Sequence, residues 1–411
     1  MGGDGGDPGQ PGATAKVEQL NAAEWRRRLG VAAVLDALGA EEGLTRYVGG
    51  AVRDDLLGLP VNDIDLATRL RPDAVIERLK NAQLKAVPTG IEHGTVTAVS
   101  SGQPFEVTSL RRDVSTDGRR AIIEYTDDWR EDAARRDFTI NALMADPQSG
   151  EIFDYFGGLE DLADRRVRFI GDPLQRIAED HLRILRFFRF HARFGQGEPD
   201  LSALKACAER ANDLMALSRE RIADELLKLL AVGDPAATVR LMVDHAILKP
   251  VLPEIGAAML QQLEQLTAAE RLAGIKGDPL RRLAALLPED PDLAERIAVR
   301  LKLSKLARKR LACAAERKLD SNPRALAYRV GMDCAVDRLL LAGKSEEAAA
   351  ILNWTIPRLP IGGGALIERG VPQGPDVART LRVIENGWVA AGFPTGETFE
   401  RLLQEIIGRR Q

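Results

Sequence analysis

The first residues that could carry chemistry are a pair of glycines and a pair of aspartates near the start of the chain. Gly49 and Gly50 follow an apolar strand candidate at 45–48 and precede a helix candidate. Glycine lets the backbone approach a phosphate closely, and unpaired N–H groups at a helix start can donate to phosphate oxygens. Asp63 and Asp65 are two positions apart, so in a strand both carboxylates would leave the same face. Two carboxylates beside a phosphate turn suit a Mg²⁺ site for phosphoryl transfer.

Each of these motifs also has a plain structural interpretation. Aspartates spaced in this way are common in turns and at solvated edges, and a Gly-Gly after a strand is usually only a turn. Glu106, on a strand candidate at 105–110, is the best placed third acid, although an outward glutamate on an alternating strand is an equally good interpretation. His93 is interpreted as a structural hydrogen-bonding residue, because a metal ion already lowers the pKa of an attacking hydroxyl.

A second group of charged residues follows at Asp132, Arg135, Arg136 and Asp137. Adjacent guanidiniums can contact a phosphate bidentately or stack on a base. Asp137 could accept a hydrogen bond from a ribose hydroxyl, which would distinguish ribonucleotides from deoxyribonucleotides. The alternative is a helix N-cap with a surface ion pair, which contributes about 1 kcal/mol.

A third group could choose a base. Residues 176–189 are predicted to form one helix, on which Asp180 and Arg183 lie one turn apart. The carboxylate only accepts hydrogen bonds and the guanidinium only donates them. Cytosine and adenine present an amino donor beside a ring-nitrogen acceptor, whereas uracil and guanine present a carbonyl acceptor beside an N–H donor. The pair would therefore accept CTP and ATP and refuse UTP and GTP. The alternative is a simple ion pair.

The elements that must position these groups change in character along the chain. Strand candidates alternate with helices up to about residue 159, and helical periodicity continues from there to the end. The predicted fold class is therefore α+β, a mixed-sheet head followed by an elongated all-helical neck, body and tail. Strands are predicted at 45–48, 63–67, 95–99 and 105–110, and helices at 22–38, 72–80, 174–192, 218–230, 236–245, 293–301 and 375–388. The predicted parts are a disordered tail at 1–21, a head at 22–158, a neck at 159–232, a body at 233–355 and a helical tail at 356–411.

Composition limits the class of protein further. The 411 residues are 45% hydrophobic and 29% charged, as in a soluble globular protein of two or more domains, and no apolar run reaches the length of a membrane span. The net charge of −4 implies that any RNA contact comes from local patches, such as the basic residues at 302–310, which equally suit a solvated helix face. The three cysteines have no paired spacing, so reduced thiols in a cytoplasmic protein are predicted.

The order of these motifs resembles that of a known family. The run at 49–68 resembles the first motif of the class II tRNA nucleotidyltransferases, the CCA-adding enzymes, in the superfamily of DNA polymerase beta. Residues 135–137 resemble the family's Arg-Arg-Asp motif, and 179–183 resemble its Glu-Asp-x-x-Arg template motif, with His181 where the family often has proline. The match is dense from about residue 46 to 230, and it is weaker in the tail.

The resemblance implies stepwise transfer of CMP, CMP and AMP from CTP and ATP to the 3′ end of tRNA, without a protein partner. Tail helices would grip the tRNA elbow, 154–158 would form a hinge, and 111–125 would be a flexible loop that helps to switch from C to A. The catalytic residues implied are Asp63, Asp65 and Glu106, with Mg²⁺ on Asp63 and Asp65. The nucleotide-binding residues implied are Gly49, Gly50, Arg53, Arg136, Asp137, Asp180, Arg183, Arg186 and Arg189.

Three alternatives stay open from the sequence. A poly(A) polymerase shares the fold, but residues 88–95 fit the tRNA enzymes better. An enzyme that adds only CC or only A is harder to exclude, although the intact segment 111–125 argues against CC addition alone. A catalytically silent RNA-binding protein is the third alternative, and the retained aspartates and arginine motifs argue against it.

Overall fold

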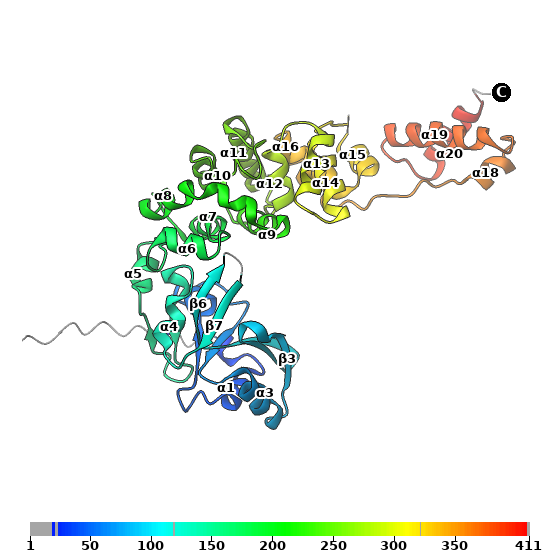
Figure 1. The fold of residues 1–411 in the computed structure, drawn as a ribbon. Coiled ribbons are helices and arrows are strands. Elements are labelled where there is room, and N and C mark those ends of the chain that lie inside the picture. Colours follow the sequence, from blue (N-terminus) through cyan, green and yellow to red (C-terminus); the bar gives the residue numbers. More distant parts are fainter. Residues whose placement is uncertain (1–18, 21–23, 118–119, 321, 409–411) are drawn as a thin grey trace, which may run out of the picture. The chain divides into compact units, whose positions relative to one another are not determined.

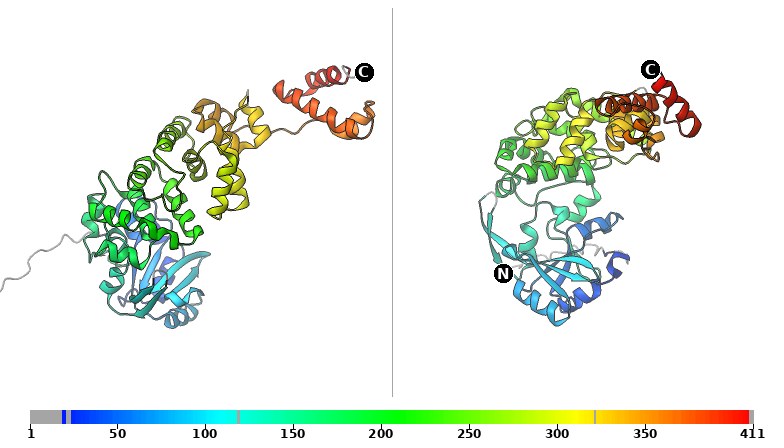
Figure 2. Two further views of the ribbon diagram at one scale, coloured as in Figure 1. Left: turned by 45° about the horizontal axis from the view of Figure 1, so that its top comes forward. Right: turned by 90° about the vertical axis from the view of Figure 1, so that its right-hand side faces the viewer.

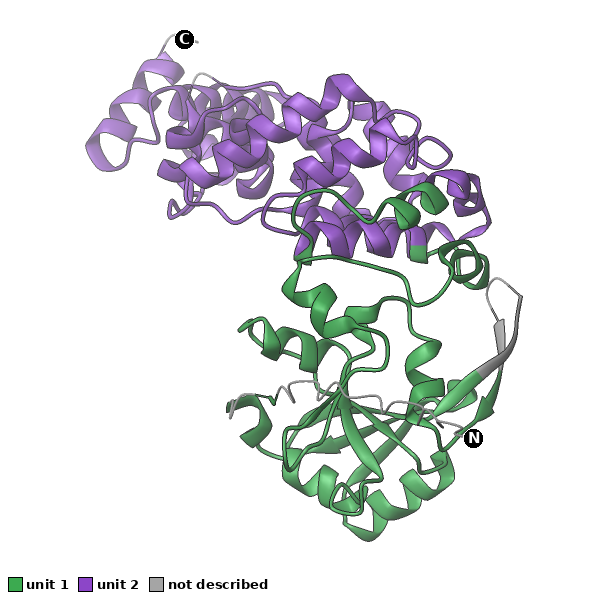
Figure 3. Cartoon of the chain, turned by 90° about the vertical axis from the view of Figure 1, so that its left-hand side faces the viewer, with its two compact units in different colours: residues 1–183, 194–207 green, residues 184–193, 208–411 purple. Residues whose placement is uncertain are grey.

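The computed structural model describes residues 19–20, 24–117, 120–320 and 322–408, without the side chains of 113–122. The chain divides into two compact units, shown in green and purple in Figure 3. Unit 1 comprises residues 1–183 and 194–207, and unit 2 comprises residues 184–193 and 208–411. The predicted disordered segment lies outside the described residues except at Gln19 and Leu20, where the Leu20 N–H donates to the Gly150 carbonyl at 2.9 Å.

Unit 1 is built on a seven-stranded mixed sheet with the strand order β3-β4-β5-β2-β1-β8-β9 (Figure 1). Strands β2 and β5 run parallel, and the other neighbouring pairs are antiparallel. The predicted strands are thereby confirmed to within a few residues. The strands of this sheet are β1 Thr45–Val48, β2 Asp65–Thr68, β3 Lys85–Gly90, β4 Thr95–Ser100, β5 Gln103–Ser109, β8 Met144–Ala145 and β9 Ile152–Phe153.

Helices cover the sheet and connect its strands. Helices α1 and α3 contact one another and strand β4, and they lie on the same face of the sheet in all three ribbon views (Figures 1 and 2). The sheet and these helices form the α/β part of the predicted head. The helices of unit 1 are α1 Val31–Ala37, α2 Gly50–Leu56, α3 Pro72–Asn81, α4 Trp129–Ala134, α5 Gly158–Ala163 and α6 Pro173–Glu179, whereas α7 Arg183–Phe194 and α8 Leu201–Glu209 cross the division.

The predicted helix at 22–38 is wrong as a single element. Residues 24–27 form a 3₁₀ turn, and α1 begins only at Val31. Gly30 between them has φ 90°, and a Cβ at this position would lie 2.7 Å from the Ser100 Oγ. The close approach of the chain to β4 therefore needs glycine at this position. The left-handed backbone of Gly30 prevents one continuous helix from running through residues 22–38.

The segment predicted as a flexible loop, 111–125, contains two paired strands. Strand β6 Arg111–Asp117 pairs antiparallel with β7 Arg120–Tyr125, and residues 118–119 between them lie outside the described residues. At the base of this hairpin, the Arg112 guanidinium pairs with Glu124 on β7 at 2.9 Å and with Glu131 on α4 at 3.1 Å. The backbone of the segment is therefore paired as a hairpin, with a shift of register between Asp113 and Ser115.

All the elements that the structure describes entirely within unit 2 are helical, which confirms the predicted change in fold character. Four predicted helices, at 218–230, 236–245, 293–301 and 375–388, are found to within two residues at each end. The helices are α9 Arg219–Leu230, α10 Ala236–Asp244, α11 Ala257–Leu272, α12 Pro279–Ala285, α13 Pro291–Arg300, α14 Lys305–Ala315, α15 Pro323–Val330, α16 Met332–Leu341, α17 Ser345–Ile351, α18 Gly363–Glu368, α19 Pro375–Ala390 and α20 Gly396–Gly408. No described helix combines the length and apolar character that a membrane span needs.

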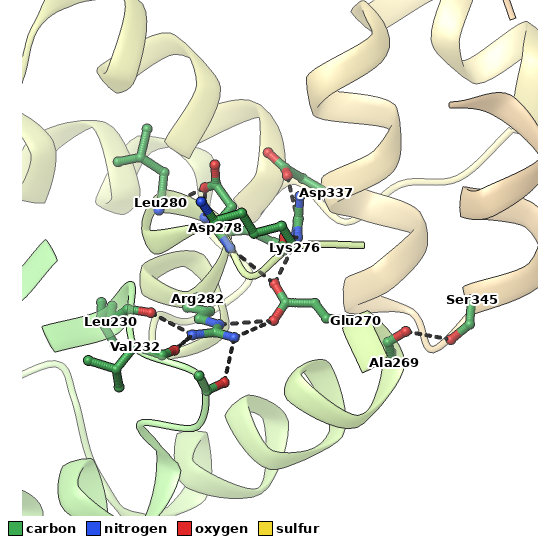
Figure 4. A network of polar contacts seen from close by, with 12 residues as sticks. Leu230, Val232, Ala269, Glu270, Lys276, Asp278, Leu280, Arg282, Asp337 and Ser345 are labelled. Atoms are coloured by element: carbon green, nitrogen blue, oxygen red, sulfur yellow. Dashed lines mark hydrogen bonds and ion pairs between the residues drawn. The ribbon is translucent and has the colours of Figure 1, made fainter. Parts of the chain in front are cut away.

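A buried network of charged side chains holds the middle of unit 2 together (Figure 4). Glu270 on α11 is 2% exposed and pairs with Arg281 and Arg282 on α12 at 2.7 and 2.9 Å. Asp337 on α16 is fully buried and pairs with Arg281 and Arg310. Since each buried charge has an opposite partner, the network avoids the cost of leaving an ion unpaired in the interior.

The prediction of reduced thiols is wrong for two of the three cysteines. Cys313 on α14 and Cys334 on α16 form a disulfide. They are 21 residues apart in the sequence, and only the packing of α14 against α16 brings them together. Cys207 is a buried free thiol, and burial raises its pKa.

Candidate active site

The two glycines predicted to hold phosphate form the turn between β1 and α2. The Gly49 N–H donates to the Leu143 carbonyl at 3.0 Å, and the Gly49 carbonyl accepts from the Arg53 N–H at 3.0 Å. Gly49 has φ 64° and ψ −119°, and a Cβ there would lie 3.3 Å from Arg136 Nη1. The turn therefore needs glycine for its backbone angles and for the guanidinium beside it.

Three carboxylates gather where β2 lies beside β5. Asp65 is the first residue of β2, and it lies directly opposite Glu106 in the parallel pairing with β5. Asp63 precedes the strand, and both Asp63 and Glu106 are exposed. Ile64 between the aspartates is 5% exposed and belongs to the buried core. The parallel pairing of these strands thus brings Glu106 to the two aspartates, which lie about 40 residues earlier in the sequence.

The carboxylates affect one another electrostatically. Burial, chiefly, and the charge of Glu106 raise the pKa of Asp65 to about 6. Arg136 acts in the opposite direction, and Asp63 adds a smaller upward effect. Among the described residues, no three Asp, Glu, His or Cys side chains form a preassembled metal cage. Hard oxygen donors with mutual repulsion nevertheless fit a divalent cation whose remaining ligands come from substrate phosphates.

The arginine motif lies beside the glycine turn. Asp132 on α4 is 1% exposed and pairs with Arg135 at 2.8 Å and with Arg136 at 3.2 Å. Burial alone would raise the pKa of Asp132, but the two guanidiniums outweigh it and lower that pKa. Asp132 therefore orients Arg136, whose Nη1 lies near Gly49 and whose charge acts on Asp65.

The neighbouring Asp137 and Arg53 are part of a buried polar group. The Asp137 Oδ1 accepts from the Phe138 N–H and from Asn141 Nδ2, both at 2.9 Å. Arg53 is 5% exposed, pairs with Asp54 at 2.7 Å and donates to Asn141. Asn141 therefore connects two residues that were predicted to bind nucleotide, and the sequence contained no motif that singled it out.

The predicted single helix across the template motif is wrong. Helix α6 ends at Glu179, Asp180 is extended with φ −150° and ψ 105°, and α7 begins at Arg183. The Asp180 Oδ1 accepts from the Leu182 N–H at 3.1 Å, and its carbonyl accepts from the Arg183 N–H at 3.0 Å. An aspartate that bonds the backbone ahead of it competes with helical hydrogen bonding, so the motif forms a turn.

Arg183 is held in place by the first residue of the template motif, Glu179, and by two backbone carbonyls. Its guanidinium donates to Glu179 Oε2 at 2.6 Å, to the Arg176 carbonyl at 2.8 Å and to the Arg135 carbonyl at 3.1 Å. Arg176 is 8% exposed, pairs with the same Glu179 oxygen and donates to the Arg135 and Arg136 carbonyls. Glu179 and Arg176 thereby connect the template turn to the arginine motif.

The two later arginines belong to unit 2. Arg189 donates through Nε to Glu225 Oε2 at 2.6 Å, and Arg186 lies 3.8 Å from the other Glu225 oxygen. Both guanidiniums lie over the ring of Phe190. Glu225, which is 3% exposed on α9, is thus the acid that orients both arginines.

Other sequence candidates have different surroundings. The side chain of His93 is 60% exposed in a 3₁₀ turn. In the basic run at 302–310, Arg310 points inward and pairs with Asp337 and Asp278, so this residue does not belong to a solvated patch. The Asp154 carboxylate accepts from the N–H groups of Gly158 and Leu159 at 2.9 Å and so caps the start of α5.

Comparisons with known proteins agree with this geometry. The Poly A polymerase head domain family matches residues 45–168, and the family described as the probable RNA and SrmB- binding site of polymerase A matches residues 199–259. With the acidic strand pair on β2 and β5, the first match defines the class as a nucleotidyltransferase.

Relatives along most of the chain narrow this class. The mitochondrial CCA tRNA nucleotidyltransferase 1 of Mus musculus is 33% identical over 89% of this chain and 87% of its own length. The CCA-adding enzyme of Streptococcus gordonii is 32% identical over 90% of this chain and 94% of its own. The crystal structure of the Bacillus stearothermophilus CCA-adding enzyme with CTP has a TM-score of 0.71 at 26% identity and covers 92% of this chain and 97% of that one. The chain belongs to the family of CCA-adding tRNA nucleotidyltransferases, which confirms the resemblance seen in its motifs.

Proposed function

We propose that this protein adds or repairs the 3′-terminal CCA of tRNA by transferring CMP, CMP and then AMP from CTP and ATP, with release of pyrophosphate. The observation that carries the proposal is the meeting of Asp65 and Glu106 on parallel strands, beside Arg136 and the glycine turn. Family membership supports the substrates, since relatives over most of the chain are named for CCA addition. The Bacillus stearothermophilus relative binds CTP.

In this proposal, Asp63 and Asp65 hold Mg²⁺ and Glu106 is the third acid of the site. When bound to these carboxylates, Mg²⁺ would supply charge that lowers the pKa of an attacking hydroxyl and stabilises a leaving pyrophosphate. Gly49 and Gly50 receive the triphosphate. Their backbone permits the close approach, and the guanidinium of Arg136 supplies the opposite charge.

The remaining predicted residues act on the sugar and the base. Asp137 accepts from the ribose hydroxyl, while Arg53 braces the same region through its bond to Asn141. Asp180 and Arg183 select cytosine and adenine by offering one acceptor and one donor. Arg186 and Arg189 complete the nucleotide contacts, and Glu225 orients them.

The proposed parts of the protein are those given by the sequence. They are a head at 22–158, a neck at 159–232, a body at 233–355 and a tRNA-contacting tail at 356–411. The hairpin segment 111–125 would assist the change from C to A addition. A cytoplasmic location stays a prediction, and the Mus musculus relative carries a mitochondrial name.

The catalytic assignment is tested with a radiolabelled tRNA transcript that lacks CCA. We expect extension with CTP and ATP in Mg²⁺, and no extension in excess EDTA. Asp63→Ala should lower the rate at least about 10³-fold, because it removes a metal ligand. Asp36→Ala, a change at an exposed aspartate on α1, is the matched control and should behave as wild type. Full activity in a folded Asp63→Ala protein would refute the assignment.

A further inference from the structure

Unit 2 contains a hollow of about 510 Å³ whose charged lining is entirely basic in the described structure. Arg189 and Arg193 contribute from α7, Lys228 contributes from α9, and the backbone turn 231–233 completes the wall. Arg193 and Lys228 are exposed, so an incoming ligand can reach them. The lining therefore fits an anion.

The buried charge network offsets the partial negative charge at the C-terminal end of α9. The C-terminal carbonyls of a helix carry partial negative charge and normally repel anions. Here Arg282 donates to the carbonyls of Leu230 at 2.7 Å and Gly233 at 3.0 Å, and also to that of Val232. Figure 4 shows this guanidinium between the carbonyls and Glu270. The carbonyls of the turn that lines the hollow thus accept hydrogen bonds from a buried cation, which offsets their partial negative charge.

The partners of Lys228 and Arg189 leave these two residues able to contribute positive charge to the hollow. Lys228 pairs with Asp224 at 2.7 Å, but both side chains are more than half exposed, and such surface pairs are weak and exchangeable. Arg189 is oriented by Glu225, which is buried and does not line the hollow. An RNA phosphate could therefore approach Lys228 without separating a buried ion pair.

We infer that this hollow binds a backbone phosphate of the RNA substrate. The inference rests on the proposed function and adds a contact site to it. The segment that supplies Lys228 and the turn 231–233 lies within residues 199–259, matched by the family described as a probable RNA binding site. Two exposed cations beside a neutralised helix end suit one phosphodiester of a polymer, whose contact is electrostatic and sequence-independent.

The test is filter binding of a tRNA transcript lacking CCA to the full-length protein between 50 and 300 mM KCl, without nucleotides. Arg193→Gln and Lys228→Gln should each raise the Kd about fivefold at 100 mM salt and reduce the slope of log K against log salt by about one. Lys344→Gln is the matched control, because Lys344 is also an exposed lysine paired with one exposed acid, Glu347. Its affinity and slope should equal those of wild type.

The same preparations are assayed for extension with varied CTP, and the KM for CTP should not change in the two hollow variants. Wild-type affinity and slope in both variants would overturn the inference, as would an equal loss in Lys344→Gln. A raised KM for CTP with unchanged tRNA affinity would also overturn it and assign the hollow to a nucleotide triphosphate. Wild-type protein that binds tRNA but does not extend it would overturn the proposed function. The tRNA affinities of the variants would still test whether the hollow binds a phosphate.

Discussion

At the scale of single residues, the ionised carboxylate of Asp65 is destabilised by its surroundings in the fold. Asp65 is half-buried beside Glu106, and its pKa is raised to about 6. An acid with a raised pKa in the folded state makes folding less favourable as pH rises from its unfolded value, near 3.8, to about 6. Above about pH 6 the unfavourable contribution of Asp65 to the free energy of folding has reached its full size. A dication bound between the acids would offset this cost, so stability and activity oppose one another here.

Asp65→Asn should therefore stabilise the metal-free protein at pH 7.5 by up to about 3 kcal/mol, since each unit of pKa shift corresponds to about 1.4 kcal/mol. The gain should shrink as the pH is lowered from 6 towards 4, where wild-type Asp65 becomes protonated. Urea unfolding in EDTA at several pH values measures the difference. An equal or lower stability of the variant at pH 7.5 would contradict the proposed electrostatic cost.

Base choice should depend on Glu179 as a positioning residue, because its carboxylate holds both Arg183 and Arg176. In Glu179→Gln the two guanidiniums lose their common counter-ion, and Arg183 is less well fixed. The ratio of kcat/KM for CTP over UTP should fall about tenfold, equivalent to about 1.4 kcal/mol. Glu160→Gln, at an exposed position on α5, is the control. A merely structural role would lower kcat for both nucleotides and leave their ratio unchanged.

At the scale of elements, the chain enters α5 through a very close backbone approach. A Cβ at Gly158 would lie 2.4 Å from the Thr139 carbonyl oxygen, and the Asp154 carboxylate bonds the N–H groups that open the helix. Thr139 follows the arginine motif, so this contact connects α5 to the site. The motif 154–158 therefore has a capping role that a hinge prediction did not anticipate, and its hinge role stays a prediction.

Gly158→Ala should destabilise the protein by about 2 kcal/mol or more, because the backbone must move to admit the methyl group. The control is Gly364→Ala on α18, where a Cβ would meet open space and alanine favours the helix. Both are compared by urea unfolding. A Gly158→Ala protein as stable as wild type would show that the Thr139 carbonyl can move at little cost.

The helices and strands that could be predicted from the sequence are those with local sequence signals. Strand β1 was predicted at its observed bounds, and α3 within one residue, because alternation and Pro72 are local signals. The breaks at Gly30 and Asp180 were missed, since both depend on detail that periodicity does not contain. At Gly30 the cause is a contact with Ser100, and at Asp180 it is one side chain that bonds its own turn.

At the scale of the whole molecule, motif order was enough to predict the family and the mixed-sheet and helical parts. The chemistry of the site was predictable where residue types are close in sequence, as for Asp63 and Asp65. Apart from Glu106, which lies opposite Asp65, partners far apart in the chain were not predicted. They include Glu225 for Arg189, Arg282 for the end of α9 and the Cys313–Cys334 disulfide. Such pairs leave no spacing pattern in a single sequence, because packing alone brings them together.

The central claim is that this protein builds CCA on tRNA by selecting bases with its own side chains. The most direct measurement resolves, at single-nucleotide resolution, the products from a tRNA transcript lacking CCA with CTP, ATP, both, UTP or GTP. We expect two added residues with CTP, three with CTP and ATP together, and none with UTP or GTP. A long ladder with ATP alone, or addition of UTP as readily as CTP, would contradict it.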